Sequence, residues 1–190
     1  MAAVESTMLP LGTELPAFSL TDPDGKRHSP AEGQRAYLVM FICNHCPFVK
    51  HIADGLAALG RDYAERGVGI FAINSNDTVA YPQDGLEAMR AEAKARGYVF
   101  AYLLDEDQSV AKEYRAACTP DFFVFDAGQR LVYRGQFDDS RPSNDAPVTG
   151  HDVRAALEAV LAGHAPVTAQ TPSIGCNIKW APGNAPDYYA

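Results

Sequence analysis

The sequence predicts an α/β fold in which helices flank a mixed central β-sheet. The chain has 190 residues, of which 47% are hydrophobic and 21% charged, a composition typical of a globular protein with one sizeable core. Short apolar runs alternate with amphipathic segments along most of the chain, which favours parallel pairing of the strands. A β-hairpin and a helix expected near the C-terminal end make the sheet mixed rather than purely parallel.

The first half of the chain predicts a β-hairpin followed by a strand, a helix and a strand. Residues 17–20 and 26–28 flank the sequence Asp-Pro-Asp-Gly, which strongly favours a turn. The unbroken apolar run at 36–42 is typical of a strand buried on both faces of a sheet. Residues 47–65 carry apolar side chains at helical spacing, and the apolar run at 68–74 predicts the next strand.

The second half continues this alternation and ends in a tail. In order, the expected elements are a helix at 86–96, which belongs to a helical insertion around residues 82–96, a strand at 98–104, a helix at 109–117, strands at 122–126 and 130–137, and a helix at 152–162. We expect residues 1–165 to form one domain and the proline-rich tail 166–190 to pack on it through its apolar side chains.

The charge of the chain argues against some classes of partner. The formal net charge is −8 and the pI is about 5.0, which disfavours binding to nucleic acid or to an anionic membrane. The N-terminal residues lack the basic and apolar regions of a secretory signal, and no run approaches the ~18 apolar residues of a membrane span. We therefore expect a cytoplasmic, reducing location, with no nucleic-acid or membrane partner.

Two of the four cysteines are three positions apart, at a place suited to redox chemistry. Cys43 and Cys46 lie between the strand expected at 36–42 and the helix expected at 47–65. A thiolate at a helix N-terminus is stabilised by unpaired backbone N–H groups, so we expect a lowered pKa for Cys43, with His45 adding to the effect. Cys46 is then placed to resolve a mixed disulfide on Cys43. Four cysteines in 190 residues are too few for a disulfide scaffold.

Two structural interpretations of this CxxC element stay open. One is a zinc half-site, with ligands drawn from Cys43, His45, Cys46 and His51. A structural zinc site usually needs a second Cys/His pair at related spacing, whereas Cys118 and Cys176 are isolated in the sequence. The other interpretation is a pair of ordinary buried cysteines.

Several stretches that together span most of the chain carry a family resemblance. They are LPAFSLTDPDGK, CNHCPFVK, CTPDFFVFD, YRGQFDDSRP and TPSIGCNIKW. With these motifs the chain resembles the thioredoxin-like superfamily, in its redoxin (AhpC/TSA) branch, and more narrowly the peroxiredoxin-like family 1. The resemblance implies a thioredoxin fold that carries the N-terminal β-hairpin and the helical insertion, and it implies no bound cofactor or metal.

The resemblance also implies where the supporting site residues lie. In the thioredoxin fold, a cis-proline loop faces the CxxC and leaves a backbone edge free for the substrate. Here that loop is Thr119-Pro120, and since cis peptides are essentially a property of proline, we expect the cis bond at Pro120. Asn44 and His45, between the cysteines, are expected to support the site together with this loop.

The sequence departs from the family patterns near the cysteines. Peroxiredoxins carry Pro-x-x-x-Thr/Ser-x-x-Cys, but alignment on Cys46 places Val39 and Cys43 at the first two positions. Thioredoxin has a buried aspartate where this chain has Tyr37. Another base, His45 or a water molecule, is therefore expected to accept the proton.

The expected activity is thiol–disulfide oxidoreduction. Cys43 attacks a disulfide in a protein or small-molecule substrate, Cys46 displaces the product, and an external dithiol donor of the thioredoxin or glutathione type reduces the pair again. One alternative is a thiol peroxidase, an antioxidant enzyme in which a Cys43 sulfenic acid condenses with Cys46. Another alternative is a non-catalytic redox-sensing or binding module.

Four further residues are candidates for the site: two cysteines, each with more than one interpretation, and one pair of oppositely charged residues. Cys118 precedes the expected cis-proline and is either an extra redox thiol near Cys43 or a small buried hydrophobic residue. Cys176 lies in the tail, where it could pair with Cys118 or resolve Cys43 under oxidation. Asp139 and Arg141 are expected to form an ion pair that orders their loop, while a direct action of Arg141 on a peroxide is the alternative.

Overall fold

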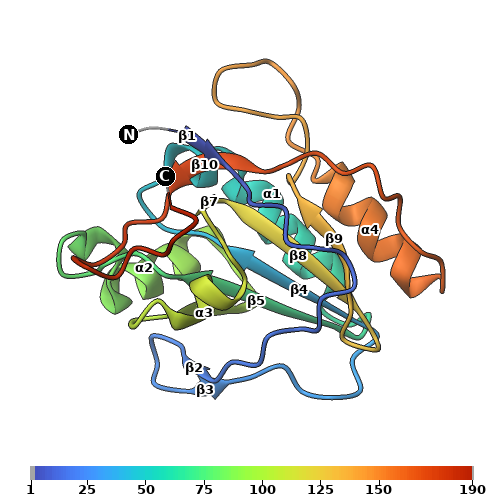
Figure 1. Ribbon diagram of the computed structural model, residues 1–190, viewed down its shortest axis with the longest axis horizontal. Coiled ribbons are helices and arrows are strands. Elements are labelled where there is room, and N and C mark those ends of the chain that lie inside the picture. The colour runs from blue at the N-terminus through green and yellow to red at the C-terminus, as the bar shows by residue number, and fades with distance from the viewer. Residues whose placement is uncertain (1–2, 190) are drawn as a thin grey trace.

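The computed structural model describes residues 3–189, which form a mixed sheet flanked by helices (Figure 1). The sheet has seven strands in the order β3-β2-β6-β5-β4-β8-β9. They are β2 (Leu20–Thr21), β3 (Arg27–His28), β4 (Ala36–Phe41), β5 (Val68–Asn74), β6 (Ala101–Leu104), β8 (Asp121–Asp126) and β9 (Leu131–Gly135). Strands β4, β5 and β6 are parallel, whereas β8 is antiparallel to β4, so the mixed sheet expected from the sequence is confirmed.

Helices cover both faces of this sheet. They are α1 (Pro47–Tyr63), α2 (Leu86–Arg96), α3 (Ser109–Glu113) and α4 (His151–Leu161), with a short 3-10 helix, η1 (Pro82–Asp84), before α2. Alternate side chains of β4 point to opposite faces, so Leu38 and Met40 pack in a core with α1 and α4, while Tyr37 and Val39 pack in a second core with α3. Strand β4 is therefore buried on both sides and holds the segment that follows it at a rigid position.

A second sheet of three strands joins the two ends of the chain. Strand β10 (Ile174–Asn177) pairs antiparallel with β1 (Ala3–Glu5) on one side and with β7 (Cys118–Thr119) on the other. Figure 1 shows the red tail that carries β10 beside the blue N-terminal strand. The sequence does not predict these three strands, because each is short and lacks an alternating pattern of apolar and polar residues.

Most of the expected elements form, with some ends shifted. The β2–β3 hairpin is present, and β5 and α2 have the expected bounds. Strand β6 begins only at Ala101, after α2 has been capped by Gly97 in the left-handed conformation. Helix α3 ends at Glu113, shortly before Arg115, whose φ of 49° is incompatible with a helix. Within residues 3–189, no helix is long and apolar enough to cross a membrane.

Candidate active site

The two cysteines of the CxxC lie at the junction of β4 and α1. Strand β4 ends at Phe41, and α1 begins at Pro47 with Cys46 as its N-cap residue. Proline suits the first turn of a helix, because the backbone N–H that it lacks would have no partner there. Both thiols are buried, with 2% of Cys43 and 0% of Cys46 exposed, and all four cysteines are free thiols.

The loop that carries Thr119 and Pro120 contacts both thiols. The Thr119–Pro120 peptide bond is cis, as expected. In the dithiol form, Cys46 Sγ donates a hydrogen bond to the Thr119 carbonyl oxygen at 3.1 Å, and Cys43 Sγ lies 3.5 Å from Thr119 Oγ1. The structure therefore brings Cys43, Cys46, Thr119 and Pro120 together in one site.

The negative charge of the thiol pair belongs on Cys46. Hydrogen bonding by the Cys43 thiol lowers the pKa of Cys46 to about 5; burial opposes this shift, and the Cys176 thiol adds to it. The same hydrogen bond, with burial and the charge of Asp84, raises the pKa of Cys43 well above its ordinary value. The Thr119 carbonyl oxygen favours protonated Cys46, whereas the two neighbouring thiols favour its thiolate. The pKa of Cys43 is thus raised and not lowered as expected, because its hydrogen bond to Cys46, its burial and the charge of Asp84 all oppose its thiolate.

Asp84, at the end of η1, is a buried acid that the sequence analysis missed. Its Oδ1 accepts hydrogen bonds from the backbone N–H groups of Asn44 and His45 at 2.9 and 3.2 Å. Its Oδ2 lies 2.5 Å from His45 Nδ1 and accepts a hydrogen bond from Asn76 Nδ2 at 2.8 Å. Asn44 and His45 therefore support the site by holding the CxxC turn against η1. No local pattern indicates this contact, because it joins segments far apart in the sequence.

The same cluster brings together side chains of the kind that bind metals. Donor atoms of Cys43, His45 and Asp84 lie within 4.8 Å of one another. However, His45 and Asp84 bind each other, and Nε2 of His51 lies 2.6 Å from Ser140 Oγ. The four-ligand zinc set of the alternative interpretation is therefore not assembled, and we treat this cluster as a hydrogen-bonded polar site.

The group best placed to accept a proton from Cys43 comes from outside β4. Tyr37, at the position of the thioredoxin aspartate, donates a hydrogen bond to a backbone carbonyl at 2.8 Å. His45 lies beside Cys43, and Asp84 holds its Nδ1 atom. The Nε2 atom of His45 is buried without a hydrogen-bond partner among residues 3–189. The expectation that His45 serves as the base is thus compatible with the geometry, with Asp84 as its positioning partner.

Asp121 is a second buried acid that the sequence analysis missed. It follows the cis-proline directly and lies opposite Phe41 in the pairing of β8 with β4. Its Oδ1 accepts a hydrogen bond from the backbone N–H of Phe122 at 3.1 Å, whereas Oδ2 has no partner among the described residues. Burial raises the pKa of Asp121 to about 8. Burial, together with the charge of this carboxylate, also raises the pKa of Cys118 well above its ordinary value.

The other two cysteines differ in what they contact. Cys118 is fully buried, and its Sγ donates to the Pro120 carbonyl oxygen at 3.6 Å, in keeping with a small buried residue. The Cys176 thiol instead interacts with Cys46. The sequence analysis expects Cys176 to pair with Cys118 or to resolve Cys43, and this stays a prediction; in the structure β10 pairs Cys176 with Thr119, the residue that contacts both CxxC thiols.

The backbone edge of the cis-proline loop is not free. Thr119 pairs with Cys176 of β10, so the chain's own tail covers the edge that the resemblance assigns to a substrate. Gly175 makes this close approach feasible, since a Cβ atom there would lie 2.0 Å from the Thr119 carbonyl oxygen. The expected open edge is therefore corrected to a covered one.

Arg141 orders its loop without an ion pair to Asp139. Its Nη1 donates to the carbonyl oxygens of Asp138 and Ser140 at 2.6 and 2.8 Å, and its Nη2 donates to Gln136 Oε1. The Gln136 side chain also donates to Asp139 Oδ1 at 2.9 Å. In place of the expected ion pair, the Arg141 guanidinium group donates hydrogen bonds to backbone carbonyl oxygens and to the Gln136 side chain.

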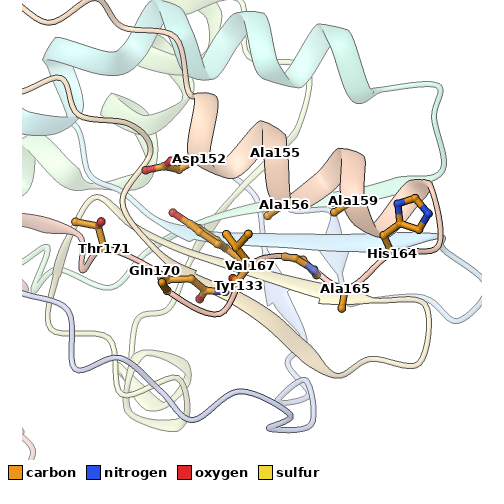
Figure 2. Close-up of a pocket in the computed structure, with 12 residues that line it drawn as sticks. Tyr133, Asp152, Ala155, Ala156, Ala159, His164, Ala165, Val167, Gln170 and Thr171 are labelled. Carbon is orange, nitrogen blue, oxygen red and sulfur yellow. Dashed lines mark hydrogen bonds between the residues drawn. The ribbon is translucent and has the colours of Figure 1, made fainter.

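A groove between α4 and the segment 164–171 lies apart from the thiols. Figure 2 shows Tyr133, Asp152 and His164 on its walls, among several alanine side chains from α4. No cysteine lines this groove. This groove is therefore separate from the buried thiol site at the start of α1.

Comparisons with known proteins agree with this fold. Residues 11–134 match the AhpC/TSA family, so the chain belongs to that family, a redoxin branch of the thioredoxin-like superfamily. A search of curated proteins found no match. The family and the thiol site together support a thiol-based redox function.

Two solved structures are similar over nearly the whole chain. An uncharacterized conserved protein from Geobacillus kaustophilus is 53% identical with a TM-score of 0.94, over 96% of this chain and 98% of that chain. A hypothetical protein from Sinorhizobium meliloti 1021 is also 53% identical, with a TM-score of 0.93, over 94% and 99% of the two chains. The thioredoxin domain of a thiol-disulfide oxidoreductase from Bacteroides vulgatus, at 16% identity and a TM-score of 0.59 over 77% and 96%, shares the fold. The thioredoxin fold expected from the sequence is confirmed.

Proposed function

We propose that this protein is a thiol–disulfide oxidoreductase that cycles its Cys43–Cys46 pair between dithiol and disulfide. The observation that carries the proposal is the Cys46 thiol at the start of α1, whose pKa is lowered to about 5 by hydrogen bonding from Cys43. At neutral pH this sulfur is a thiolate, which is the form that attacks disulfides.

The reaction begins at Cys46 rather than at Cys43, the reverse of the order expected from the sequence. The Cys46 thiolate attacks one sulfur of the substrate disulfide, which forms a mixed disulfide and releases the other substrate sulfur as a thiolate. Cys43 then gives its proton to His45, which Asp84 orients, and attacks the Cys46 sulfur. The second substrate thiolate leaves, and the Cys43–Cys46 disulfide remains until an external dithiol of the thioredoxin or glutathione type reduces it.

The burial of the site favours a particular kind of substrate. Cys43 and Cys46 are 2% and 0% exposed, and β10 covers the cis-proline edge. A folded protein surface cannot reach sulfurs in this position without displacement of the tail. A small-molecule disulfide or a flexible segment that carries one therefore fits the site better than a rigid protein.

A thiol peroxidase is the second candidate, favoured by a buried thiolate that a small oxidant could reach more easily than a protein. In that reaction the Cys46 thiolate attacks the peroxide oxygen, which forms a sulfenic acid and releases water or an alcohol. Cys43 condenses with the sulfenic acid, and the Cys43–Cys46 disulfide forms with loss of water.

Two dithiol-coupled assays test these candidates on the same protein. We expect reduction of a small disulfide and of insulin, with the smaller substrate reduced faster, and loss of both activities in Cys46→Ser. Cys118→Ser is the matched control and should keep wild-type rates, because its thiol donates to the Pro120 carbonyl oxygen and takes part in no step of the proposed cycle. Peroxide consumption without disulfide reduction would replace the first candidate with the second, and absence of both activities would contradict the proposal.

A further inference from the structure

Strand β10 brings a third thiol into the active site. Cys176 lies directly opposite Thr119 in the antiparallel pairing of β10 with β7. Side chains directly opposite each other in such a pair lie on the same face of the sheet. Thr119 is the residue that contacts Cys43 through Oγ1 and Cys46 through its carbonyl oxygen. The side chain of Cys176 therefore faces the CxxC, and all three cysteines belong to one buried cluster.

The chain holds Cys176 in this position on both sides of the strand. Before it, Gly175 allows β10 to approach Thr119 more closely than any residue with a Cβ atom could. Ser173 Oγ donates to the Pro120 carbonyl oxygen at 2.6 Å, which ties the entry of β10 to the cis-proline. On its far side β10 pairs with β1, with Cys176 opposite Ala3. A tail that merely covered the site would not need a glycine and a thiol at adjacent positions.

We propose that Cys176 is a third redox-active thiol that accepts the disulfide from the Cys43–Cys46 pair by reaction at Cys46. This inference rests on the dithiol cycle proposed above and adds a step to it. Cys46 becomes the shared sulfur, with Cys43 and Cys176 as its two alternative partners.

The step is an intramolecular thiol–disulfide exchange. The Cys176 sulfur, once deprotonated, attacks the Cys46 sulfur of the Cys43–Cys46 disulfide. The bond between Cys46 and Cys43 breaks, a bond between Cys46 and Cys176 forms, and the displaced Cys43 thiolate takes up the proton that Cys176 has released. No net oxidation occurs, so the exchange needs no further oxidant or reductant.

The charges around Cys176 favour this order of events. In the reduced protein, burial and then the interaction with Cys46 raise the pKa of Cys176 to about 12, which keeps it a thiol. Once Cys46 is in a disulfide it carries no charge, so its contribution to the raised pKa of Cys176 disappears. The positive charge of Lys179 acts in the opposite direction and favours the Cys176 thiolate. The Cys176 thiolate therefore forms more readily once the first disulfide has removed the charge of Cys46.

Cys118 provides the internal comparison for this proposal. Cys118 is the β7 residue that pairs with Asn177 of β10, next to the Thr119–Cys176 pair. Both cysteines therefore belong to the same pairing of β7 with β10. The Cys118 thiol donates to the Pro120 carbonyl oxygen, and Cys118 is not a member of the cluster that holds the other three. The Cys118 thiol is therefore held by the cis-proline backbone, which makes it the comparison for Cys176.

Trypsin separates the thiols into peptides that reveal the pairing. Cleavage after lysine and arginine leaves Cys43 and Cys46 together in peptide 36–50, Cys118 in peptide 116–130 and Cys176 in peptide 155–179. A Cys46–Cys176 disulfide links peptides 36–50 and 155–179, whereas a Cys43–Cys46 disulfide stays within one peptide.

The experiment oxidises the full-length protein in a graded glutathione buffer, blocks free thiols and maps the peptides by mass spectrometry. We expect the linked pair 36–50/155–179 in the wild type beside the internal disulfide, and as the main product in Cys43→Ser. The link should be lost in Cys46→Ser and unchanged in Cys118→Ser. Oxidised Cys43→Ser without the link, or a link that persists in Cys46→Ser, would overturn the proposal.

Cys176→Ser separates this proposal from the function on which it rests. Serine is close in size to cysteine, and the β10 backbone pairing remains, so we expect the variant to fold and to form the Cys43–Cys46 disulfide. If the internal disulfide does not form in a folded Cys176→Ser protein, the dithiol cycle itself fails. If it forms there while the wild type yields no linked pair, only the role of Cys176 fails.

Discussion

Two flanks cover the thiol pair, and they are built differently. On the side of Cys43, η1 is held by Asp84, a buried carboxylate that binds two backbone N–H groups and the side chains of His45 and Asn76. On the side of Cys46, β10 is held by backbone pairing to β7 and β1. The first flank presents a charge to the pair, and the second presents a thiol.

The difference explains how two chemically identical side chains acquire different roles. The charge of Asp84 acts on Cys43 and opposes a thiolate there, while Cys46 has two thiols and a helix start around it. The flank on the Asp84 side therefore sets which sulfur is charged, and the flank on the β10 side sets what that sulfur can bond to. Changes in one flank should alter charge, and changes in the other should alter access and pairing.

Among the substitutions, removal of the Asp84 carboxylate should have the largest effect. Asp84→Ala leaves buried donors of Asn44, His45 and Asn76 without their acceptor, so we expect a loss of about 3–5 kcal/mol in the free energy of unfolding, measured by urea titration. Asp84→Asn keeps the volume and removes the charge, and should lower the pKa of Cys43. A Cys43 pKa that does not fall in folded Asp84→Asn would contradict the role assigned to this flank.

Asp121, the first residue of β8, is a buried acid directly after the cis-proline, and it should make stability depend on pH. Burial raises the pKa of Asp121 from its ordinary value of 3.8 to about 8. Between these values the folded protein holds a proton that the unfolded chain has released, so stability falls as pH rises through this window. We expect a fall on the order of 6 kcal/mol from this group.

Asp121→Asn serves as the control for this pH dependence. The amide cannot ionise, so the variant should show a flatter profile of the free energy of unfolding over the same pH range. A wild-type protein whose stability rises between pH 4 and pH 8, or an Asp121→Asn variant with an unchanged slope, would contradict the neutral state assigned to this buried acid.

A methyl group at Gly175 should open the β10 flank. The new Cβ atom would lie 2.0 Å from the Thr119 carbonyl oxygen, so β10 has to shift away from β7. We expect Gly175→Ala to lose about 1–3 kcal/mol of stability and to react faster with a small alkylating agent at Cys46. Gly128→Ala is the matched control, since its Cβ meets only the Asp126 side chain at 3.3 Å. Equal alkylation rates in the two variants would show that β10 does not limit access.

The smallest effect is expected at Lys179, the cation that acts on Cys176. Its Nζ atom donates to the carbonyl and side-chain oxygens of Asn177 at 2.6 and 3.0 Å. Lys179→Gln removes the charge and should slow the formation of the Cys46–Cys176 disulfide by about threefold, with little change at the Cys43–Cys46 pair. Lys94→Gln, on the exposed side of α2, should leave the rate unchanged. If the Cys46–Cys176 disulfide forms at equal rates in both variants, the Lys179 charge does not assist the Cys176 thiolate.

The sequence predicts the Cys46 side of the site better than its surroundings. The CxxC between an apolar strand and a helix, the proline after it and the cis-proline motif are local patterns, and each forms as expected. Strand β10 could not be predicted, because Ile174–Asn177 has no alternation and its pairing partners lie far away in the chain. The position of Asp84 beside Cys43 is equally non-local, and the charge distribution depends on it. This is why the sequence places both thiols at the junction of strand and helix but does not predict that their pKa values shift in opposite directions.

The central claim, that Cys46 holds the charge of the reduced pair, can be measured directly. A pH titration of the β-carbon chemical shifts of isotope-labelled cysteines by NMR reports each thiol separately and does not depend on access to a reagent. We predict that Cys46 titrates with a midpoint of about 5, while Cys43 and Cys176 remain thiols at neutral pH. If Cys43 ionises first and Cys46 remains a thiol at neutral pH, the assignment of the two flanks is wrong.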